Sequence, residues 1–338
     1  MLLLLSCLLG LLVSCGPRQP VLDEEQVSPE KRLVLRFSHV VAENTPKGKA
    51  AQRFADLVNE RLAGRVEVQV YANASLYTDS EEMQALIDNK VQLIAPATAK
   101  LSQWFPQWQL FDLPFLFADY RDVHRAMDGP AGKTLMKLLT RRGLLGLAMW
   151  DNGFKVMSAT RPLRRVEDFA GLTFRVMPSP VLQAQFRCLG ARTLPLDFSE
   201  VFVALESGHA HGAENPPSNL YSKGFYRVQP YVTVSNHGYL GYVVLTNATF
   251  WHRLPPEVRQ VLEETMAEVT VWEREIAAAE NARALALVEQ SGFCQVIELP
   301  EEERERWRRA MRPVYLQFED VIGPELLAAV SGNGTERE

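Results

Sequence analysis

The spacing of apolar and polar residues predicts a strand and helix order for the first hundred residues. Residues 33–39 and 66–71 alternate apolar and polar positions, and this two-residue period is typical of strands. Between them, residues 48–62 carry apolar side chains at helical spacing. A helix over 81–89 and a short buried strand over 91–95 follow. This order predicts a parallel sheet with helical crossovers.

A second set of strands and helices follows later in the chain. It comprises strands over 143–150, 172–177, 193–196 and 210–214, with helices over 180–189 and 199–207. Two such sets predict an α/β protein with two lobes. Sheets of this kind bind ligands in a cleft at the carboxyl ends of their strands.

The last third of the chain is predicted to be mainly helical. After a strand over 239–245, Pro255-Pro256 opens a long helix over 257–290. At about 1.5 Å per residue this helix is about 50 Å long, which exceeds one lobe, so we expect it to span both. A charged helix over 301–312 is predicted as the final one.

The amino terminus reads as an export signal. Residues 2–14 form an apolar run that is shorter than the roughly 20 residues of a transmembrane helix. The run fits the core of a secretory signal, and no Lys or Arg precedes it. The following sequence LVSC resembles a bacterial lipobox, which predicts a signal peptide over 1–15 and lipidation of Cys15. A plain cleaved signal and an uncleaved membrane anchor are the alternatives.

Composition and charge narrow the function classes. The 338 residues, 47% hydrophobic and 23% charged, are enough for two globular domains. A formal net charge of −5 argues against a nucleic-acid surface but leaves room for a small basic pocket that binds an anion. None of the four cysteines belongs to a C-x-x-C pair, so no zinc ribbon or dithiol site is expected. Cys188 and Cys294 are predicted to be buried thiols.

The sequence lacks the motifs of common catalytic and cofactor sites. No G-x-S-x-G, P-loop, G-x-G-x-x-G, H-E-x-x-H or EF-hand pattern occurs, so we expect neither an enzyme nor a cofactor. His209 and His211 are the one pair with metal-like spacing, and no third ligand lies near them in the sequence. We therefore expect no metal site.

A charged residue inside an apolar strand is the strongest functional signal. Arg175 lies within the predicted strand 172–177, where a buried guanidinium is costly unless its charge is paired. It requires either an internal carboxylate or an anionic ligand, and the residues alone leave both open. Two further polar motifs follow predicted strands: Asn152-Gly153-Phe154-Lys155, and Glu214-Asn215-Pro216-Pro217, in which the prolines stop the strand.

Taken together, these segments resemble the solute-binding receptors of tripartite ATP-independent periplasmic (TRAP) transporters, and most closely the four-carbon dicarboxylate branch. The similar segments run in order from about Leu33 to Pro256. They are FSHVVAENTPKG from Phe37, WDNGFK from Trp150, FSEV from Phe198, ENPPSN from Glu214 and HGYLGY from His237. The resemblance implies a periplasmic-binding-protein-like fold with two lobes, an interlobe cleft and a long domain-spanning helix.

The resemblance also implies roles for individual residues. Arg175 is expected to pair with a substrate carboxylate and Asn215 to hydrogen-bond the same end of the ligand. Lys155 is expected to serve a second carboxylate, so that a monocarboxylate would leave it without a partner. Thr98 is expected to contribute a hydroxyl from the first lobe, and Lys47 to face either the pocket or solvent. Further positions expected around the pocket are His39, Phe198, His237 and Tyr239.

The implied function is that of an extracytoplasmic receptor. It would bind malate, succinate or fumarate between its lobes and deliver the ligand to a small and a large membrane subunit. The expected location is the periplasm, with a lipid anchor if Cys15 is modified, and the expected state is a monomer without a nucleic-acid partner. The alternatives are a receptor for another organic acid, such as a sugar acid, a keto acid or sialic acid, and a sensor module.

The predicted domain organisation follows from the same expectations. A signal peptide over 1–15 is followed by a polar tether over 16–31. The tail covers residues 331–338. The first lobe is expected to comprise 32–152 plus 243–278, and the second 153–242 plus 279–330.

Overall fold

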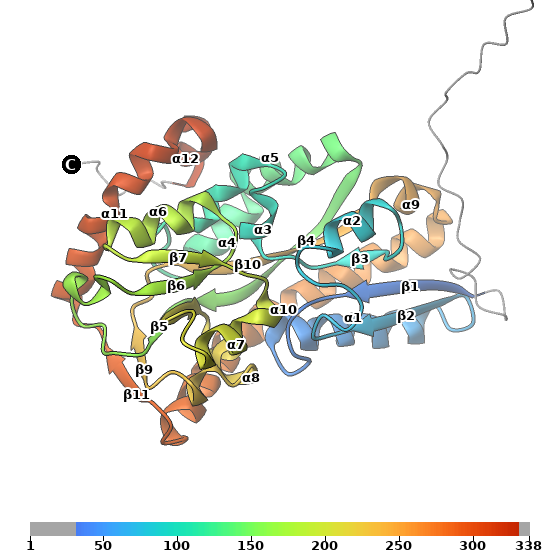
Figure 1. The fold of residues 1–338 in the computed structure, drawn as a ribbon. Helices are drawn as coiled ribbons and strands as arrows, with labels where there is room; N and C mark the ends of the chain where they lie inside the picture. Colours follow the sequence, from blue (N-terminus) through green and yellow to red (C-terminus); the bar gives the residue numbers. More distant parts are fainter. Residues whose placement is uncertain (1–31, 331–338) are drawn as a thin grey trace, which may run out of the picture.

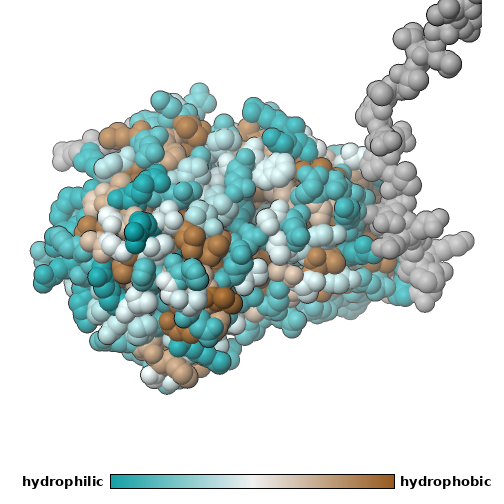
Figure 2. Space-filling model, viewed as in Figure 1, coloured by the Kyte–Doolittle hydropathy of each residue, from teal (hydrophilic) through white to brown (hydrophobic). Residues whose placement is uncertain are grey.

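The structure is a computed structural model that describes residues 32–330 (Figure 1). The predictions for the signal peptide, Cys15, the tether and the tail lie outside these residues. No helix in the described range is both long and apolar enough to span a membrane. On the face seen in Figure 2, apolar residues form small separate patches among polar ones.

The first sheet contains five strands in the order β2-β1-β3-β10-β4. Strands β1 (Leu33–Ser38), β2 (Val66–Tyr71) and β3 (Leu93–Ile94) are parallel, as predicted. Strand β10 (Tyr239–Asn247) runs antiparallel to β3 and β4. Strand β4 (Leu144–Phe154) is longer than the predicted strand 143–150, so Asn152-Gly153-Phe154 lies inside the strand rather than after it.

The second sheet contains six strands in the order β11-β9-β5-β8-β6-β7. The expected strands are present as β6 (Thr173–Val176), β7 (Arg192–Pro195) and β8 (Gly212–Asn215). Three further strands were not predicted: β5 (Val156–Ala159), β9 (Tyr231–Val234) and β11 (Gln295–Glu298). Strand β5 is antiparallel to both neighbours, so the second sheet is mixed, as is the first through β10.

Helices cover the first sheet and join it to the second. Helix α1 (Pro46–Arg61) begins where the Thr45 hydroxyl accepts a hydrogen bond from the Gly48 N–H. Shorter helices of this part are α2 (Glu82–Ile87), α3 (Thr98–Leu101), η2 (Pro106–Asp112), α4 (Tyr120–Asp128), α5 (Pro130–Leu139), η3 (Thr140–Arg142) and α9 (Ala248–Arg253). Helix α10 (Pro256–Gln290) has 35 residues and contacts α1, β4 and α8, so it spans both sheets.

The helices of the second sheet include α6 (Pro180–Cys188), which packs against it through Phe186. The Phe186 ring stacks on Phe174 of β6 at 4.6 Å between ring centres. Cys188 and Cys294 are free thiols and are half-buried rather than buried. The remaining short helices are η4 (Val166–Phe169), η5 (Phe198–Glu200), α7 (Val201–Glu206), α8 (Pro217–Ser222) and η6 (Phe225–Arg227).

The carboxyl-terminal helices differ from the prediction. Helix α11 runs over Glu301–Ile322, so the expected end at residue 312 is wrong, and α12 (Pro324–Val330) follows it. The helix continues through Pro313 because Val314, Phe318 and Ile322 form a buried stripe at a four-residue spacing. Burial of this stripe outweighs the hydrogen bond that Pro313 cannot donate.

Three segments within residues 32–330 that connect the two sheets are defined here as the hinge. Strand β4 leads directly into β5, β9 leads into β10, and α10 passes alongside both sheets. Asn281 of α10 donates through Nδ2 to the Asn152 carbonyl and accepts from the Ser218 N–H. A Cβ at Gly153 would lie 2.8 Å from Asn281 Nδ2, so close packing of the helix explains this glycine.

Candidate functional site

Arg175 is the centre of the candidate site. Phe174 packs into the core, so Arg175 leaves β6 on the opposite face, where it is only 2% exposed. Its Nε and Nη2 both donate to the Leu196 carbonyl, at 3.1 and 2.7 Å. Within residues 32–330 no carboxylate lies within 4.0 Å of the guanidinium. Burial lowers the pKa of Arg175, and the more distant Asp79 and Glu214 carboxylates act in the opposite direction.

Asn215 lies on the strand beside Arg175. In the register of β6 and β8, Arg175 pairs with Ala213, so Asn215, two residues further along, shares its face. Asn215 is buried, and its Nδ2 has no hydrogen-bond partner among the described residues. Two buried donors from neighbouring strands therefore lie at the carboxyl ends of those strands, where α/β sheets bind ligands.

Lys155, which was expected to serve a second carboxylate of the ligand, is paired with an internal carboxylate in the structure. Its Nζ lies 2.7 Å from Glu214 Oε1, and both side chains are buried. His237 Nε2 lies 2.8 Å from Glu214 Oε2, which also accepts from Gln185 at 3.0 Å. Burial alone would raise the pKa of Glu214, but Lys155 and His237 outweigh it and lower this pKa to about 2. Lys155 and His237 therefore both bind the buried carboxylate of Glu214.

The structure does not bring Tyr239 together with Arg175. The Tyr239 hydroxyl donates to Asp151 Oδ1 at 2.5 Å. Its ring packs edge-on against Phe117 and Phe154. Burial and then Asp151 raise the pKa of Tyr239, so the hydroxyl remains a donor. This residue supports β4 near the hinge.

Lys47 is the buried cation that the sequence prediction left undecided. It is 1% exposed, so it does not face solvent. Its Nζ donates to the Ala95 carbonyl at 2.8 Å and lies 3.7 Å from the centre of the Tyr242 ring. Within the described part of the chain no carboxylate is within ion-pairing distance of it. Burial lowers the pKa of Lys47 to about 8.

The burial of Lys47 could have been predicted from its position in the helix. Lys47 occupies the same helical stripe as Ala51, Phe54 and Val58, all of which are buried on the inner face of α1. A lysine in an apolar stripe is as unusual as an arginine in an apolar strand.

His39 and Thr98 complete the first-lobe side. Both are buried, His39 after β1 and Thr98 at the start of α3. Neither ring nitrogen of His39 has a hydrogen-bond partner among residues 32–330. Burial and then Lys47 lower the pKa of His39 to about 3, so the imidazole is neutral at pH 7. A neutral imidazole offers one donor and one acceptor.

The aromatic rings of Tyr242 and Phe198 lie beside the two buried cations, Lys47 and Arg175. The Tyr242 hydroxyl accepts from Asn152 Nδ2 at 2.7 Å and Asn219 Nδ2 at 3.3 Å, which fixes the ring beneath Lys47. Tyr242 was not among the residues expected around the pocket. The Phe198 ring lies 5.8 Å from the Arg175 guanidinium.

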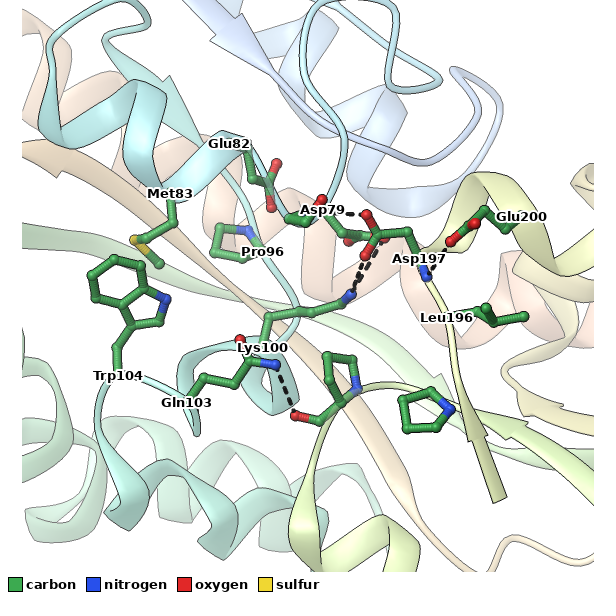
Figure 3. A pocket seen from close by; sticks show the side chains of 13 residues that line it. Asp79, Glu82, Met83, Pro96, Lys100, Gln103, Trp104, Leu196, Asp197 and Glu200 are labelled. Atoms are coloured by element: carbon green, nitrogen blue, oxygen red, sulfur yellow. Dashed lines mark hydrogen bonds and ion pairs between the residues drawn. The ribbon is translucent and has the colours of Figure 1, made fainter. Parts of the chain in front are cut away.

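A cavity of about 350 Å³ adjoins the Arg175 side at the boundary between the sheets (Figure 3). It is lined by Leu196, whose carbonyl holds Arg175, and by residues of both lobes. Figure 3 shows the Lys100 side chain extending toward Asp79 and Asp197, with dashed lines from its Nζ to their carboxylates. Lys47 of the first lobe and Arg175 of the second are both buried without a carboxylate within 4.0 Å among residues 32–330; burial lowers the pKa of each, and the more distant Asp79 acts in the opposite direction.

Comparisons with known proteins find a matching family model and similar chains. Residues 37–320 match the model of the DctP family, described as bacterial extracellular solute-binding protein, family 7. The C4-dicarboxylate-binding periplasmic protein DctP of Rhodobacter capsulatus is 45% identical over 305 residues, covering 90% of this chain and 92% of that protein.

Two solved structures are similar over most of their length. A TRAP periplasmic solute-binding protein from Shewanella oneidensis with bound succinate has a TM-score of 0.87 at 42% identity, covering 88% of this chain and 98% of that one. One from Pseudomonas aeruginosa with bound L-malate has a TM-score of 0.82 at 42% identity, covering 84% and 99%.

Proposed function

The chain belongs to family 7 of the bacterial extracellular solute-binding proteins, and from this membership we propose that it is the periplasmic receptor of a TRAP transporter for a four-carbon dicarboxylate. The observation that carries the ligand class is Arg175, a buried guanidinium without a carboxylate partner in the described chain. A charge in this position is stabilised by an anion that enters from outside.

One ligand carboxylate is proposed to bind at Arg175. Its Nε and Nη2 share a single carbonyl acceptor, so N–H groups of the planar fork remain for a carboxylate. The unpartnered Nδ2 of Asn215 is a further donor on the same face. Charge-assisted bonds of this kind gain strength when the cleft excludes water.

The second carboxylate is proposed to bind at Lys47 rather than at Lys155. Lys155 is neutralised by Glu214, whereas Lys47 holds only a carbonyl and an aromatic ring. His39 adds a neutral donor, and Thr98 is proposed to add a hydroxyl. A monocarboxylate would leave Lys47 buried without an anion, which disfavours its binding. The bound succinate and L-malate of the two solved relatives support a ligand with two carboxylates.

A ligand held at both ends couples binding to closure of the lobes. Lys47 lies on the first lobe and Arg175 on the second, so only the closed form offers both cations. The ligand favours this form by its differential affinity. We propose the lobe boundaries 32–152 plus 243–278 and 153–242 plus 279–330, with delivery to a small and a large membrane subunit. We also propose that Cys15 is lipidated.

Isothermal titration calorimetry with succinate, malate and fumarate tests the proposal. We expect dissociation constants near 1 μM, about −8 kcal/mol. Arg175→Ala is expected to abolish measurable binding while thermal unfolding still reports a folded protein. Arg192→Ala is the matched control, because Arg192 is an exposed arginine on the neighbouring strand. Unchanged binding by Arg175→Ala would contradict the site assignment. Preference for galactonate would instead indicate a sugar-acid receptor.

A further inference from the structure

Two aspartates, Asp79 and Asp197, each accept a hydrogen bond from a backbone N–H of the opposite lobe. Asp79 precedes α2 in the first lobe, and its Oδ2 accepts from the Phe198 N–H of the second lobe at 2.7 Å. Asp197 of the second lobe accepts through Oδ2 from the Ser80 N–H of the first at 3.2 Å. Each carboxylate thus binds the backbone N–H next to the other aspartate. This reciprocal pair can form only when the two lobes meet.

Lys100 joins the two carboxylates. Its Nζ lies 3.5 Å from Asp79 Oδ2 and 3.3 Å from Asp197 Oδ1 (Figure 3). Lys100 is 8% exposed, and the side chains of Asp79 and Asp197 are 5% and 20% exposed. Water therefore competes weakly for these groups, and ion pairs in such a setting are stronger than those on the open surface.

This cluster is connected to the ligand side through consecutive residues. The Leu196 carbonyl holds Arg175, Asp197 belongs to the cluster, and the Phe198 ring lies over the guanidinium. The bond from the Phe198 N–H to Asp79 fixes the backbone that carries this ring. We propose that Asp79, Lys100 and Asp197 form a latch that holds the lobes closed, seats Phe198 over Arg175 and sets the rate of ligand release.

The latch joins protein groups only, so it stabilises the closed form with or without a ligand. Its loss shifts the equilibrium toward the open form. A ligand then leaves faster, while association, which begins from the open form, changes less. The three residues are positioning residues. The release rate rests on the proposed dicarboxylate function, whereas the conformational effect does not.

The first experiment measures closure without ligand. Spin labels are placed at the exposed positions Glu60→Cys and Glu206→Cys, one on each lobe, in a background in which all four native cysteines, Cys7, Cys15, Cys188 and Cys294, are replaced by Ser. We expect ligand-free protein to contain a short-distance population in double electron–electron resonance. This population is expected to decrease in the double variant Asp79→Ala/Asp197→Ala. Unchanged distance distributions would overturn the latch.

The second experiment measures succinate release by stopped-flow fluorescence. We expect the double variant to release succinate about tenfold faster than the parent, with a smaller change in the association rate. Asp79→Asn keeps an acceptor for the Phe198 N–H but loses the ion pair, so an intermediate rate is expected. Glu167→Ala is the control, since it removes a carboxylate from an exposed ion pair with Arg306.

The outcomes separate the two proposals. If the parent binds no dicarboxylate but the double variant still loses the short-distance population, the latch stands and the proposed ligand fails. If the parent binds succinate and the double variant neither opens nor releases it faster, the latch fails and the receptor function stands.

Discussion

Lys47 and Lys155 are both buried lysines near the cleft, and their surroundings give them opposite roles. Lys155 neutralises Glu214, whereas Lys47 has a carbonyl and an aromatic ring as its neighbours. Sequence reasoning chose Lys155 because of its motif. It could not detect the ion pair, because Glu214 is 59 residues away in the chain and meets Lys155 only through the pairing of β5 with β8.

Substitution with methionine distinguishes these lysines. Lys155→Met leaves the Glu214 carboxylate buried with less compensation, so we expect unfolding by urea to show a loss of about 3 kcal/mol. Lys47→Met removes a desolvated cation, so the free energy of unfolding without ligand should not decrease. Its affinity for succinate is expected to fall about 100-fold, with a smaller effect on butyrate. Equal losses of succinate and butyrate affinity would show that Lys47 does not bind the second carboxylate.

Glu82 gives the ligand-free protein a distinct pH dependence. The carboxyl group is buried without a hydrogen-bond partner among the described residues, and burial followed by Asp79 raises its pKa from 4.5 to about 8. The folded state therefore holds this proton between pH 4.5 and 8, whereas the unfolded state releases it. Stability must then fall as the pH rises through this range.

Comparison with Glu82→Gln isolates this effect. The free energy of unfolding of the parent, minus that of Glu82→Gln, is expected to decrease by about 4 kcal/mol between pH 4.5 and 8. Urea unfolding at a series of pH values measures the difference. A difference that stays constant over this range would mean that Glu82 is not held protonated in the folded state.

At the scale of elements, the long periodic segments were predictable and the short strands were not. Strands β1 and β2 alternate over six residues each, and α10 has a proline at its start and an apolar stripe. Strands β5 and β9 have four residues each, which is too short for an alternation of apolar and polar positions to identify a strand. Those strands exist because neighbouring strands supply their hydrogen bonds, which is a tertiary effect.

Helix α11 shows how packing can override a local stop signal. Its second half should contribute to stability only if it continues past Pro313 as the structure has it. Phe318 is 6% exposed in the core, so Phe318→Ala is expected to reduce the free energy of unfolding by about 3 kcal/mol. Leu316→Ala, two residues earlier and 76% exposed, is expected to change it by less than about 0.5 kcal/mol. Denaturant unfolding of both variants measures this contrast, and similar losses would contradict the observed helix.

At the scale of the whole molecule, binding and stability are linked through the closed form. A ligand that binds only the folded state, present at 1,000 times its dissociation constant, stabilises that state by about 4 kcal/mol. For a chain of this size we expect succinate to raise the melting temperature by about 8 °C in differential scanning fluorimetry. Arg175→Ala should lose this shift. A shift of the same size in Arg175→Ala would place the anion elsewhere.

The two-lobed architecture and the burial of Arg175 could both be predicted from the sequence. The contacts that Asp79 and Asp197 make between the lobes could not. Asp79 and Asp197 are 118 positions apart and lie outside any strand or helix, so no periodicity connects them. Their meeting depends on the position of one lobe against the other, which is set by the hinge.

The position of β10 has a consequence for how the chain assembles during export. This strand lies between β3 and β4, yet it is synthesised after β5 through β9. The β1–β3 portion and β4 therefore stay unjoined until the chain up to residue 247 is available to pair, by which time most strands of the other sheet are already present. Nascent chains truncated before β10 would expose unpaired strand edges, and such edges attract chaperones and aggregate.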